Sequence, residues 1–413
     1  MELTEITDDL TGAADSSSYF TGRGQDVRIC LSGNTSLNRK SHQMLSINLS
    51  SRNTSPQMAE ESHYSLVRKL LTSSKQRFLK KIGTGFRGND AYELNGCLRA
   101  APDHLVFLID NAPDLGTFTL YGNQYCEGEI LEKSLYAKDP ILPPKESFIP
   151  SILEKNLDYP IGLVDIDSVK GGNLKKSVAD KIQSGCRVIV FDAITKQDTL
   201  HIIRTLDPLY PNVFWTGSLG IADGLAEYLF GEWKRENIPT RNIKCLGFCA
   251  SAYNQSAQQI NYSKARGLKV VPIDIDGYIE KPDCSSTIID TAISNALSLN
   301  KDNNVMIIPQ VTKYSYKPGT SQKILECFQK IAPIVCSEAD FDRLVIIGGE
   351  TSQTVFQTTA TKHLNLAHPL EAAVTQGTIC DGYMQGKEFS LKGGSVGSIQ
   401  ALEKMLCRCD IIY

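Results

Sequence analysis

The sequence predicts an α/β protein with two domains, mostly parallel sheets and a ligand cleft between the domains. Short runs of β-branched and apolar residues alternate with longer stretches whose apolar residues recur at helical spacing. The alternation stops at one polar, charged stretch and then restarts, which favours two separate units. The 413 residues are enough for two or three domains of ordinary size.

The first half of the chain contains several short apolar runs that are typical of buried strands. The run Leu3–Ile6 is the first of them. The other expected strands are Val27–Leu31, Leu45–Leu49, Leu105–Ile109, Gly162–Val164, Val188–Phe191 and Val213–Trp215. The expected helices, which carry the 3.6-residue period, are Met58–Leu71, Asp198–Leu206 and Ile221–Tyr228.

The polar stretch 231–242 is predicted to be a linker. We place the boundary near residue 240, with domains at 1–236 and 243–413. Strands are expected in the second domain at Lys244–Gly247, Lys269–Pro272, Val305–Ile308 and Leu344–Ile347. Helices are expected at Asn254–Lys264, Ser286–Ser298 and Lys323–Ile331.

Composition excludes several classes of protein. Apolar residues make up 41% of the chain, charged residues 22%, and the net charge is −3, so nothing drives general binding to nucleic acid. No apolar run is long enough to span a membrane, and the N-terminus does not look like a signal peptide, so a cytoplasmic protein is expected. The 12 cysteines include no Cys-x-x-Cys pair, and the six histidines form no ligand-spaced pair. We therefore expect idle thiols, no metal ligands and no histidine-led catalysis.

Two adjacent carboxylates, Asp8 and Asp9, follow the first short apolar run and precede Thr11-Gly12. Strand ends face the ligand crevice in open α/β sheets, and a carboxylate there can accept hydrogen bonds from a polyol or act as a general base. Alternatively, either aspartate caps the helix that follows. The sequence does not choose between the two residues.

Two further segments carry cations near turns. Lys80–Asn89 interleaves glycines with Lys81 and Arg87 in what reads as one anion-binding loop, although a solvated basic turn has the same composition. Arg52 follows an expected strand and could clamp a carboxylate with its planar fork, or be an ordinary surface arginine.

Three glycine-rich segments follow expected strands or lie near the C-terminus, namely 216–222, 348–351 and 392–397. Glycine lets backbone N–H groups approach a phosphate closely. Each segment alone is weak, but two of them in one domain favour a nucleotide.

These segments together resemble the four-carbon acid sugar kinase family, in family order over nearly the whole chain. The matching stretches are Asp8–Ala13, Ser51-Arg52, Lys80–Ile82, Arg87–Asn89, Phe191–Ala193, Gly217–Ala222, Ser256 with Gln259-Ile260, Gly348–Thr351 and Lys392–Gly394. The resemblance implies a sugar-acid-binding N-terminal domain, a nucleotide-binding C-terminal domain, and ATP-dependent phosphorylation of a hydroxyl on a small sugar acid with Mg²⁺. The implied partners are this acid and ATP, with no nucleic acid and no membrane; self-association is left open.

The same resemblance assigns site residues. Asp8 or Asp9 would be the catalytic carboxylate. The acid would be bound by Asp8, Asp9, Arg52, Lys81, Ile82, Gly83, Thr84 and Arg87. ATP would be bound by Ser251, Ser256, Gly348, Gly349, Glu350, Thr351, Gly393 and Gly394.

Three departures from the family pattern point to a changed substrate or weakened activity. Gly83 stands where the family has an acid, and Thr117 where it has an arginine. The family's Gly-Ser-x-Ser stretch is Ala250–Tyr253 here. A degenerate member that only senses a sugar acid is therefore the alternative to an active kinase.

Overall fold

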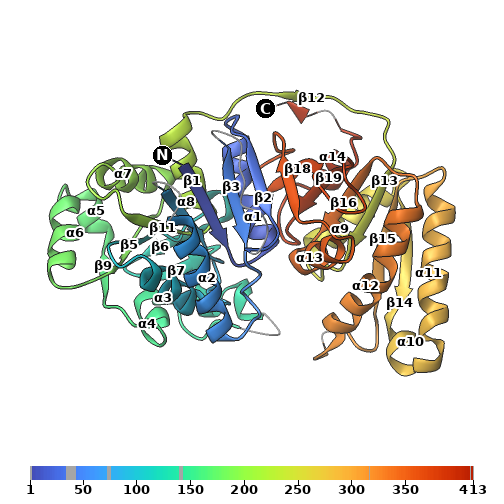
Figure 1. The fold of residues 1–413 in the computed structure, drawn as a ribbon, viewed down its shortest axis with the longest axis horizontal. Coiled ribbons are helices and arrows are strands. Elements are labelled where there is room, and N and C mark those ends of the chain that lie inside the picture. Colours follow the sequence, from blue (N-terminus) through green and yellow to red (C-terminus); the bar gives the residue numbers. More distant parts are fainter. Residues whose placement is uncertain are drawn as a thin grey trace. The chain divides into compact units, whose positions relative to one another are not determined.

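The computed structural model describes residues 2–33, 43–71, 76–138, 143–315 and 317–409, and the backbone of 411–412. The chain divides into two compact units (Figure 1). Unit 1 comprises Met1–Gln25 and Ser32–Trp233, and unit 2 comprises Asp26–Leu31 and Lys234–Tyr413. Both are α/β units with largely parallel sheets, which confirms the predicted fold class.

Unit 1 is built on seven strands that pair in parallel throughout. Their order in the sheet is β3 (Met44–Asn48), β1 (Glu2–Thr7), β4 (Gln76–Lys81), β11 (Val213–Gly217), β5 (Leu105–Leu108), β10 (Val188–Phe191) and β9 (Ile161–Val164). Most of their residues are buried, as expected for a sheet covered by helices. Because the strands are parallel, the carboxyl ends of all seven lie at one edge of the sheet.

The helices of unit 1 connect these strands. They are α1 (Leu10–Thr21), α2 (Pro56–Leu71), α3 (Asp90–Ala100), α4 (Ile149–Glu154), α5 (Ile166–Lys170), α6 (Leu174–Gln183), α7 (Lys196–Leu206) and α8 (Leu219–Phe230). Helix α2 packs against α3, and α8 packs against both α1 and α7. A small antiparallel sheet is formed by β6 (Thr117–Leu120), β7 (Asn123–Cys126) and β8 (Glu129–Ile130).

Unit 2 has a mixed sheet. Its parallel part, in order, is β14 (Lys269–Asp274), β15 (Val305–Gln310), β13 (Cys245–Cys249), β16 (Arg343–Ile347) and β19 (Glu388–Lys392). The antiparallel part continues with β18 (Val374–Ile379), β17 (His363–Leu366) and β2 (Val27–Cys30). Its helices are α9 (Asn254–Lys264), α10 (Ile275–Glu280), α11 (Ser285–Asn300), α12 (Thr320–Glu338), α13 (Gly349–Thr358) and α14 (Ala401–Met405). The short strands β12 (Asn237–Ile238) and β20 (Ile411–Ile412) pair with each other.

Several expected elements coincide with the observed ones, and others need correction. Lys80 and Lys81 were expected in a loop but are the last residues of strand β4, because their backbones pair with β1 and β11 and their side chains are buried. The strand at 27–31 was expected in the first domain but pairs with β17 in unit 2. Helix α12 runs on to Glu338 through Pro333, beyond the expected end at Ile331. Over the described residues, no helix is both long and apolar enough to cross a membrane.

Candidate functional site

Asp9 caps helix α1 in unit 1. Its backbone is extended, and its Oδ1 accepts a hydrogen bond from the Gly12 N–H at 2.8 Å. Its Oδ2 accepts from the Thr11 hydroxyl at 2.6 Å and from Arg52 Nη1 at 3.0 Å. The capping interpretation is therefore correct for Asp9, and both of its oxygens already have donors.

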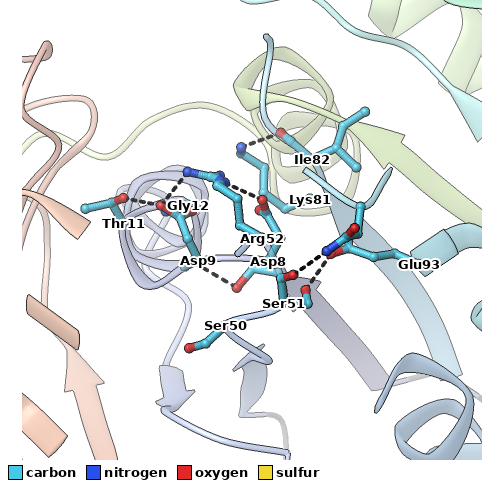
Figure 2. Close-up of polar contacts among 12 residues, drawn as sticks. Asp8, Asp9, Thr11, Gly12, Ser50, Ser51, Arg52, Lys81, Ile82 and Glu93 are labelled. Atoms are coloured by element: carbon cyan, nitrogen blue, oxygen red, sulfur yellow. Dashed lines mark hydrogen bonds and ion pairs between the residues drawn. The ribbon is translucent and has the colours of Figure 1, made fainter. Parts of the chain in front are cut away.

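Arg52 joins the two aspartates (Figure 2). Its Nε donates to Asp8 Oδ2 at 2.6 Å, while Nη1 donates to Asp9 Oδ2. Arg52 follows β3 and the aspartates follow β1, so neighbouring strand ends bring the three side chains together. Burial disfavours the charged guanidinium, but the two carboxylates outweigh it and raise the pKa of Arg52. A guanidinium has five N–H donors, so three remain for a ligand.

Asp8 is the less satisfied of the pair. Its side chain is 2% exposed, and its Oδ1 is buried without a hydrogen-bond partner among the described residues. Burial alone would raise the pKa of Asp8, but the charges of Arg52, Lys80 and Lys81 lower it further than burial raises it. Asp8 is therefore ionised and has one oxygen left to accept a hydrogen bond.

A buried ion pair lies beneath these residues. Lys80 Nζ is 2.7 Å from Glu93 Oε2, and both side chains are fully buried. Glu93 Oε1 accepts from the Ser51 hydroxyl at 2.5 Å, next to Arg52 in the chain. His63 Nε2 lies 3.7 Å from the same carboxylate, but burial first and then Lys80 lower the pKa of His63 to about 4, against the pull of Glu93. The imidazole is therefore neutral near pH 7.

The remaining predicted acid-binding residues follow β4. Lys81 Nζ donates to the carbonyl of Ile82 at 2.6 Å, and the Ile82 side chain is fully buried (Figure 2). Gly83 lies against Arg52, since a Cβ built on it would be 3.4 Å from Nη2. Thr84 is half-buried, and the Arg87 guanidinium lies 5.7 Å from the ring centre of Tyr136. Asp8, Asp9, Arg52, Lys81 and Gly83 thus form one cluster in unit 1, which we call the acid cluster.

In unit 2, three loops follow neighbouring parallel strands. The register pairs Cys249 with Ile347 and Ile347 with Lys392, so β13, β16 and β19 end at the same level. Ser251 and Ser256 follow β13, Gly348–Thr351 follow β16, and Gly393-Gly394 follow β19. All the predicted nucleotide-binding residues therefore lie at one edge of unit 2, which we call the glycine edge.

Direct contacts connect two of these loops. The Ser256 hydroxyl donates to Ser251 Oγ at 2.9 Å and to the Gly394 carbonyl at 2.6 Å. A Cβ on Gly394 would be 2.3 Å from Ser251 Oγ and 2.9 Å from Tyr253 Cδ2, so any larger residue there requires these side chains to shift. Buried Lys392 donates to the carbonyls of Gly393 and Val396, which fixes the shape of the third loop.

The helices that start at the glycine edge leave their first N–H groups without a side-chain cap. Helix α13 has Gly348 at its N-cap with φ 107°, and α9 has Tyr253; neither makes a side-chain capping bond. Uncapped N–H groups and the positive end of the helix dipole suit a phosphate. Among the residues that the structure describes, no three metal-ligating side chains gather.

Sequence reasoning missed the partners that support the acid cluster. Glu93 and Ser51 were not singled out, and Lys80 was noted only as part of a motif. Their contacts connect β4, α3 and the loop after β3, and the contacting residues lie up to 42 positions apart in the sequence. No local sequence pattern therefore predicts these contacts. The one local signal is the pair of adjacent lysines, Lys80 and Lys81.

Comparison with known proteins places both units in one family. Residues 3–225 match the sugar-binding N-terminal domain, and residues 246–402 match the nucleotide-binding C-terminal domain. The D-threonate kinase of Salmonella typhimurium is 23% identical, with 100% of this chain and 98% of that protein aligned. The D-erythronate kinase of Heliobacterium modesticaldum is 22% identical over 98% of this chain and 95% of its own length.

Solved structures agree on the fold. A Salmonella typhimurium LT2 protein superposes with a TM-score of 0.81 at 17% identity, and each chain is covered to 98%. A Haemophilus influenzae protein superposes with a TM-score of 0.72 at 19% identity, covering 98% of this chain and 99% of its own. The chain belongs to the four-carbon acid sugar kinase family.

Proposed function

We propose that this protein is a cytoplasmic, ATP-dependent kinase that phosphorylates a hydroxyl of a small, four-carbon-like sugar acid. The observation that carries the proposal is Asp8, an ionised carboxylate with one oxygen held by Arg52 and the other unpaired. A group of this kind can orient an attacking hydroxyl by accepting its hydrogen bond. The named kinases among the relatives support the reaction class.

Asp8, rather than Asp9, is the catalytic carboxylate in this proposal. Asp9 accepts from Gly12, Thr11 and Arg52, so its lone pairs are largely used. The low pKa of Asp8 makes it a weak base, which suits phosphoryl transfer, because positioning and charge neutralisation contribute most of the catalysis there.

Arg52 and Lys81 bind the carboxylate end of the acid. The three N–H groups that Arg52 keeps include both of Nη2, which lie beside Gly83. An acidic side chain at position 83 would compete for Nη2, so glycine there leaves room for a ligand carboxylate. Lys81 is 5% exposed, and among the described residues its ammonium donates to the neighbouring carbonyl of Ile82 alone, so it can turn to an anion at low cost.

The glycine edge binds ATP in this proposal. Backbone N–H groups of Gly349 and its neighbours would meet the phosphates at the N-terminus of α13, and the Ser251 and Ser256 hydroxyls lie close to the Gly394 loop. Mg²⁺ usually keeps several waters and binds through phosphates and one or two carboxylates. The exposed carboxylate of Glu350 lies at this edge, and the bound ion would neutralise charge on the transferred group.

The alternative is a non-catalytic sugar-acid sensor. Gly83 and Thr117 favour it, since they remove one acid and one cation relative to the family pattern. A sensor would bind the acid and ignore ATP, whereas the retained uncapped glycine edge favours a kinase.

The deciding experiment is ATP turnover with a panel of four-carbon acids that includes D-threonate, D-erythronate and 3-oxo-tetronate. A kinase releases ADP in proportion to the phosphorylated acid, and mass spectrometry identifies the product. Binding of an acid by calorimetry without ADP release across the panel would support the sensor instead.

A further inference from the structure

Two buried aspartates, Asp110 and Asp192, follow the neighbouring strands β5 and β10 of unit 1, and only Asp192 has hydrogen-bond partners among the described residues. Asp192 accepts hydrogen bonds from the backbone N–H groups of Tyr121 at 2.5 Å, Gly122 at 2.8 Å and Ile166 at 3.0 Å. Asp110 is equally inaccessible, at 0% exposure, yet neither of its oxygens has a hydrogen-bond partner among the described residues. Burial without partners is the costliest state for a carboxylate.

Nearby groups do not satisfy Asp110. The Ser218 hydroxyl lies close by but donates to the carbonyl of Asn111 at 3.0 Å. The charge of Lys81 reaches Asp110, but the Lys81 ammonium donates to Ile82. Burial raises the pKa of Asp110 to about 6, against the opposing effects of Ser218 and Lys81. Ser218 therefore lies close enough to lower the pKa but forms no hydrogen bond of normal geometry with Asp110, so both carboxylate oxygens can still accept one.

The register places Asp110 in the same row as Asp8. Thr7 pairs with Lys81, Lys81 with Gly217, and Thr216 with Leu108. Continuing one residue past the first two pairs and two residues past the third puts Asp8, Ile82, Ser218 and Asp110 at one level, just beyond the ends of β1, β4, β11 and β5. Three strand spacings separate the outer two, roughly 14 Å between backbones. Two aspartate side chains and a small polyhydroxy acid, with hydrogen bonds of about 2.8 Å at its ends, can bridge that distance.

We propose that Asp110 is a substrate-binding residue whose carboxylate accepts a hydrogen bond from a hydroxyl of the sugar acid other than the phosphorylated one. The proposal rests on the proposed function of the acid cluster. A hydroxyl supplies the missing donor, whereas a carboxylate or phosphate would be repelled. Asp110 therefore selects acids that carry this second hydroxyl, because an analogue without it leaves the buried carboxylate unpaired.

Asp110→Asn and Asp192→Asn form a matched pair for the test. Thermal unfolding without ligand is measured first. Asp110→Asn should melt at or above the wild-type midpoint, because it removes an unpaired buried charge while keeping the shape. Asp192→Asn should melt lower, because it weakens three bonds to backbone N–H groups. If Asp110→Asn lowers the melting midpoint as much as Asp192→Asn does, Asp110 has a structural role and the proposal is overturned.

Ligand selectivity is measured second, by calorimetry without ATP and by turnover with ATP. The probes are D-threonate, D-erythronate and their 2-deoxy and 3-deoxy analogues. The wild type should prefer at least one hydroxylated acid over its deoxy analogue by tenfold or more, and Asp110→Asn should reduce that ratio to threefold or less. An unchanged ratio, or no binding of any probe by the wild type, would refute the proposal. Selective binding without turnover would refute the kinase function and leave the role of Asp110 standing.

Discussion

The acid cluster and the glycine edge occupy the same kind of place, the carboxyl ends of parallel strands, yet they are built from different chemistry. In the acid cluster, Asp9 caps helix α1 with its side chain, and ionised groups face one another. At the glycine edge, helix α13 begins at Gly348 without a side-chain cap. A capped helix end presents side chains to a ligand, and an uncapped one presents backbone N–H groups. The first suits hydroxyls and a carboxylate, the second a phosphate.

The buried lysines show the same difference. Lys80 in unit 1 pairs with the carboxylate of Glu93. Lys392 in unit 2 donates to the carbonyls of Gly393 and Val396. One lysine neutralises a charge and the other shapes a loop, so changes in charge should affect unit 1 more than unit 2.

Removing the Asp8 charge should have the largest effect, and it should change catalysis without changing nucleotide binding. Asp8→Asn should lower kcat by roughly 10²–10⁴-fold, because the amide is a poorer acceptor for the attacking hydroxyl. The affinity for MgATP should stay the same, since the glycine edge is untouched. Asp9→Asn is the control, because asparagine caps a helix as well as aspartate does, and its kcat should fall less than tenfold. If both variants keep the full kcat, neither aspartate takes part in catalysis.

Breaking the buried ion pair should destabilise unit 1. Lys80→Met leaves Glu93 charged and unpaired, at a cost of about 3–5 kcal/mol in the free energy of unfolding. Both tryptophans, Trp215 and Trp233, belong to unit 1, so urea unfolding followed by tryptophan fluorescence reports on it. Exposed Lys176→Met serves as the control and should change stability by less than about 0.5 kcal/mol. Equal effects of the two variants would contradict the buried-pair interpretation.

The stability of unit 1 should also depend on pH, because of buried Glu5. Burial raises the pKa of Glu5 from 4.5 to about 7, although hydroxyls of Ser16, Ser46 and Ser17 oppose it. The folded state therefore binds more protons than the unfolded state between these values, and stability falls as pH rises from about 4.5 to 7. The loss attributable to Glu5 is at most about 3 kcal/mol. Glu5→Gln should flatten this slope in fluorescence-monitored unfolding, and an unchanged slope would assign it to other groups.

Charge placed at the glycine edge should weaken nucleotide binding alone. Gly349→Asp puts a carboxylate at the start of α13, where phosphate is expected, and should cost about 2 kcal/mol, or roughly 30-fold in Kd for MgATP. Gly349→Ala carries no charge and is the matched control. Isothermal titration with MgATP and, separately, with the sugar acid measures both effects. Unchanged MgATP affinity in the aspartate variant would show that the nucleotide does not bind at the start of α13.

The smallest expected effect concerns Gly83. Gly83→Asp should pair with Arg52 Nη2 and raise KM for the acid roughly fivefold, about 1 kcal/mol, as a competing surface-accessible ion pair would. Gly83→Asn has the same size without the charge and should change KM less. If both variants raise KM equally, space rather than charge at position 83 matters to the ligand.

Sequence patterns predicted the parallel framework well. The helix Asn254–Lys264 and the strand Val188–Phe191 have the expected bounds, because periodicity and apolar runs are local signals. Strands β17 and β18, which form the antiparallel part of the sheet, and the neighbouring strand β19 were not foreseen. Their polar positions, such as Asn365 and Gln376, are paired with partners from other strands rather than marked by a local apolar run.

The residues of the acid cluster could be predicted from the sequence, but the hydrogen bonds between them could not. Asp8, Asp9 and Arg52 were all named from the sequence, yet which aspartate has an oxygen to spare depends on how Arg52 divides its donors between them. Asp110 went unnoticed because nothing in its neighbours shows that it lacks a partner. Hydrogen-bond satisfaction is a property of the folded environment, so composition and spacing carry little of it.

Strand β2 has a consequence for how the protein is made. The ribosome synthesises Ile29 early, but its partner Leu364 in β17 emerges 335 residues later. At roughly 5–20 residues per second, the strand waits some 15 to 70 seconds for the sheet that it completes. A fragment beginning at residue 234 would lack β2 and expose the backbone of β17 as an open edge, which invites aggregation. Unit 2 can thus be finished only once nearly the whole chain exists, although most of its residues lie in the second half.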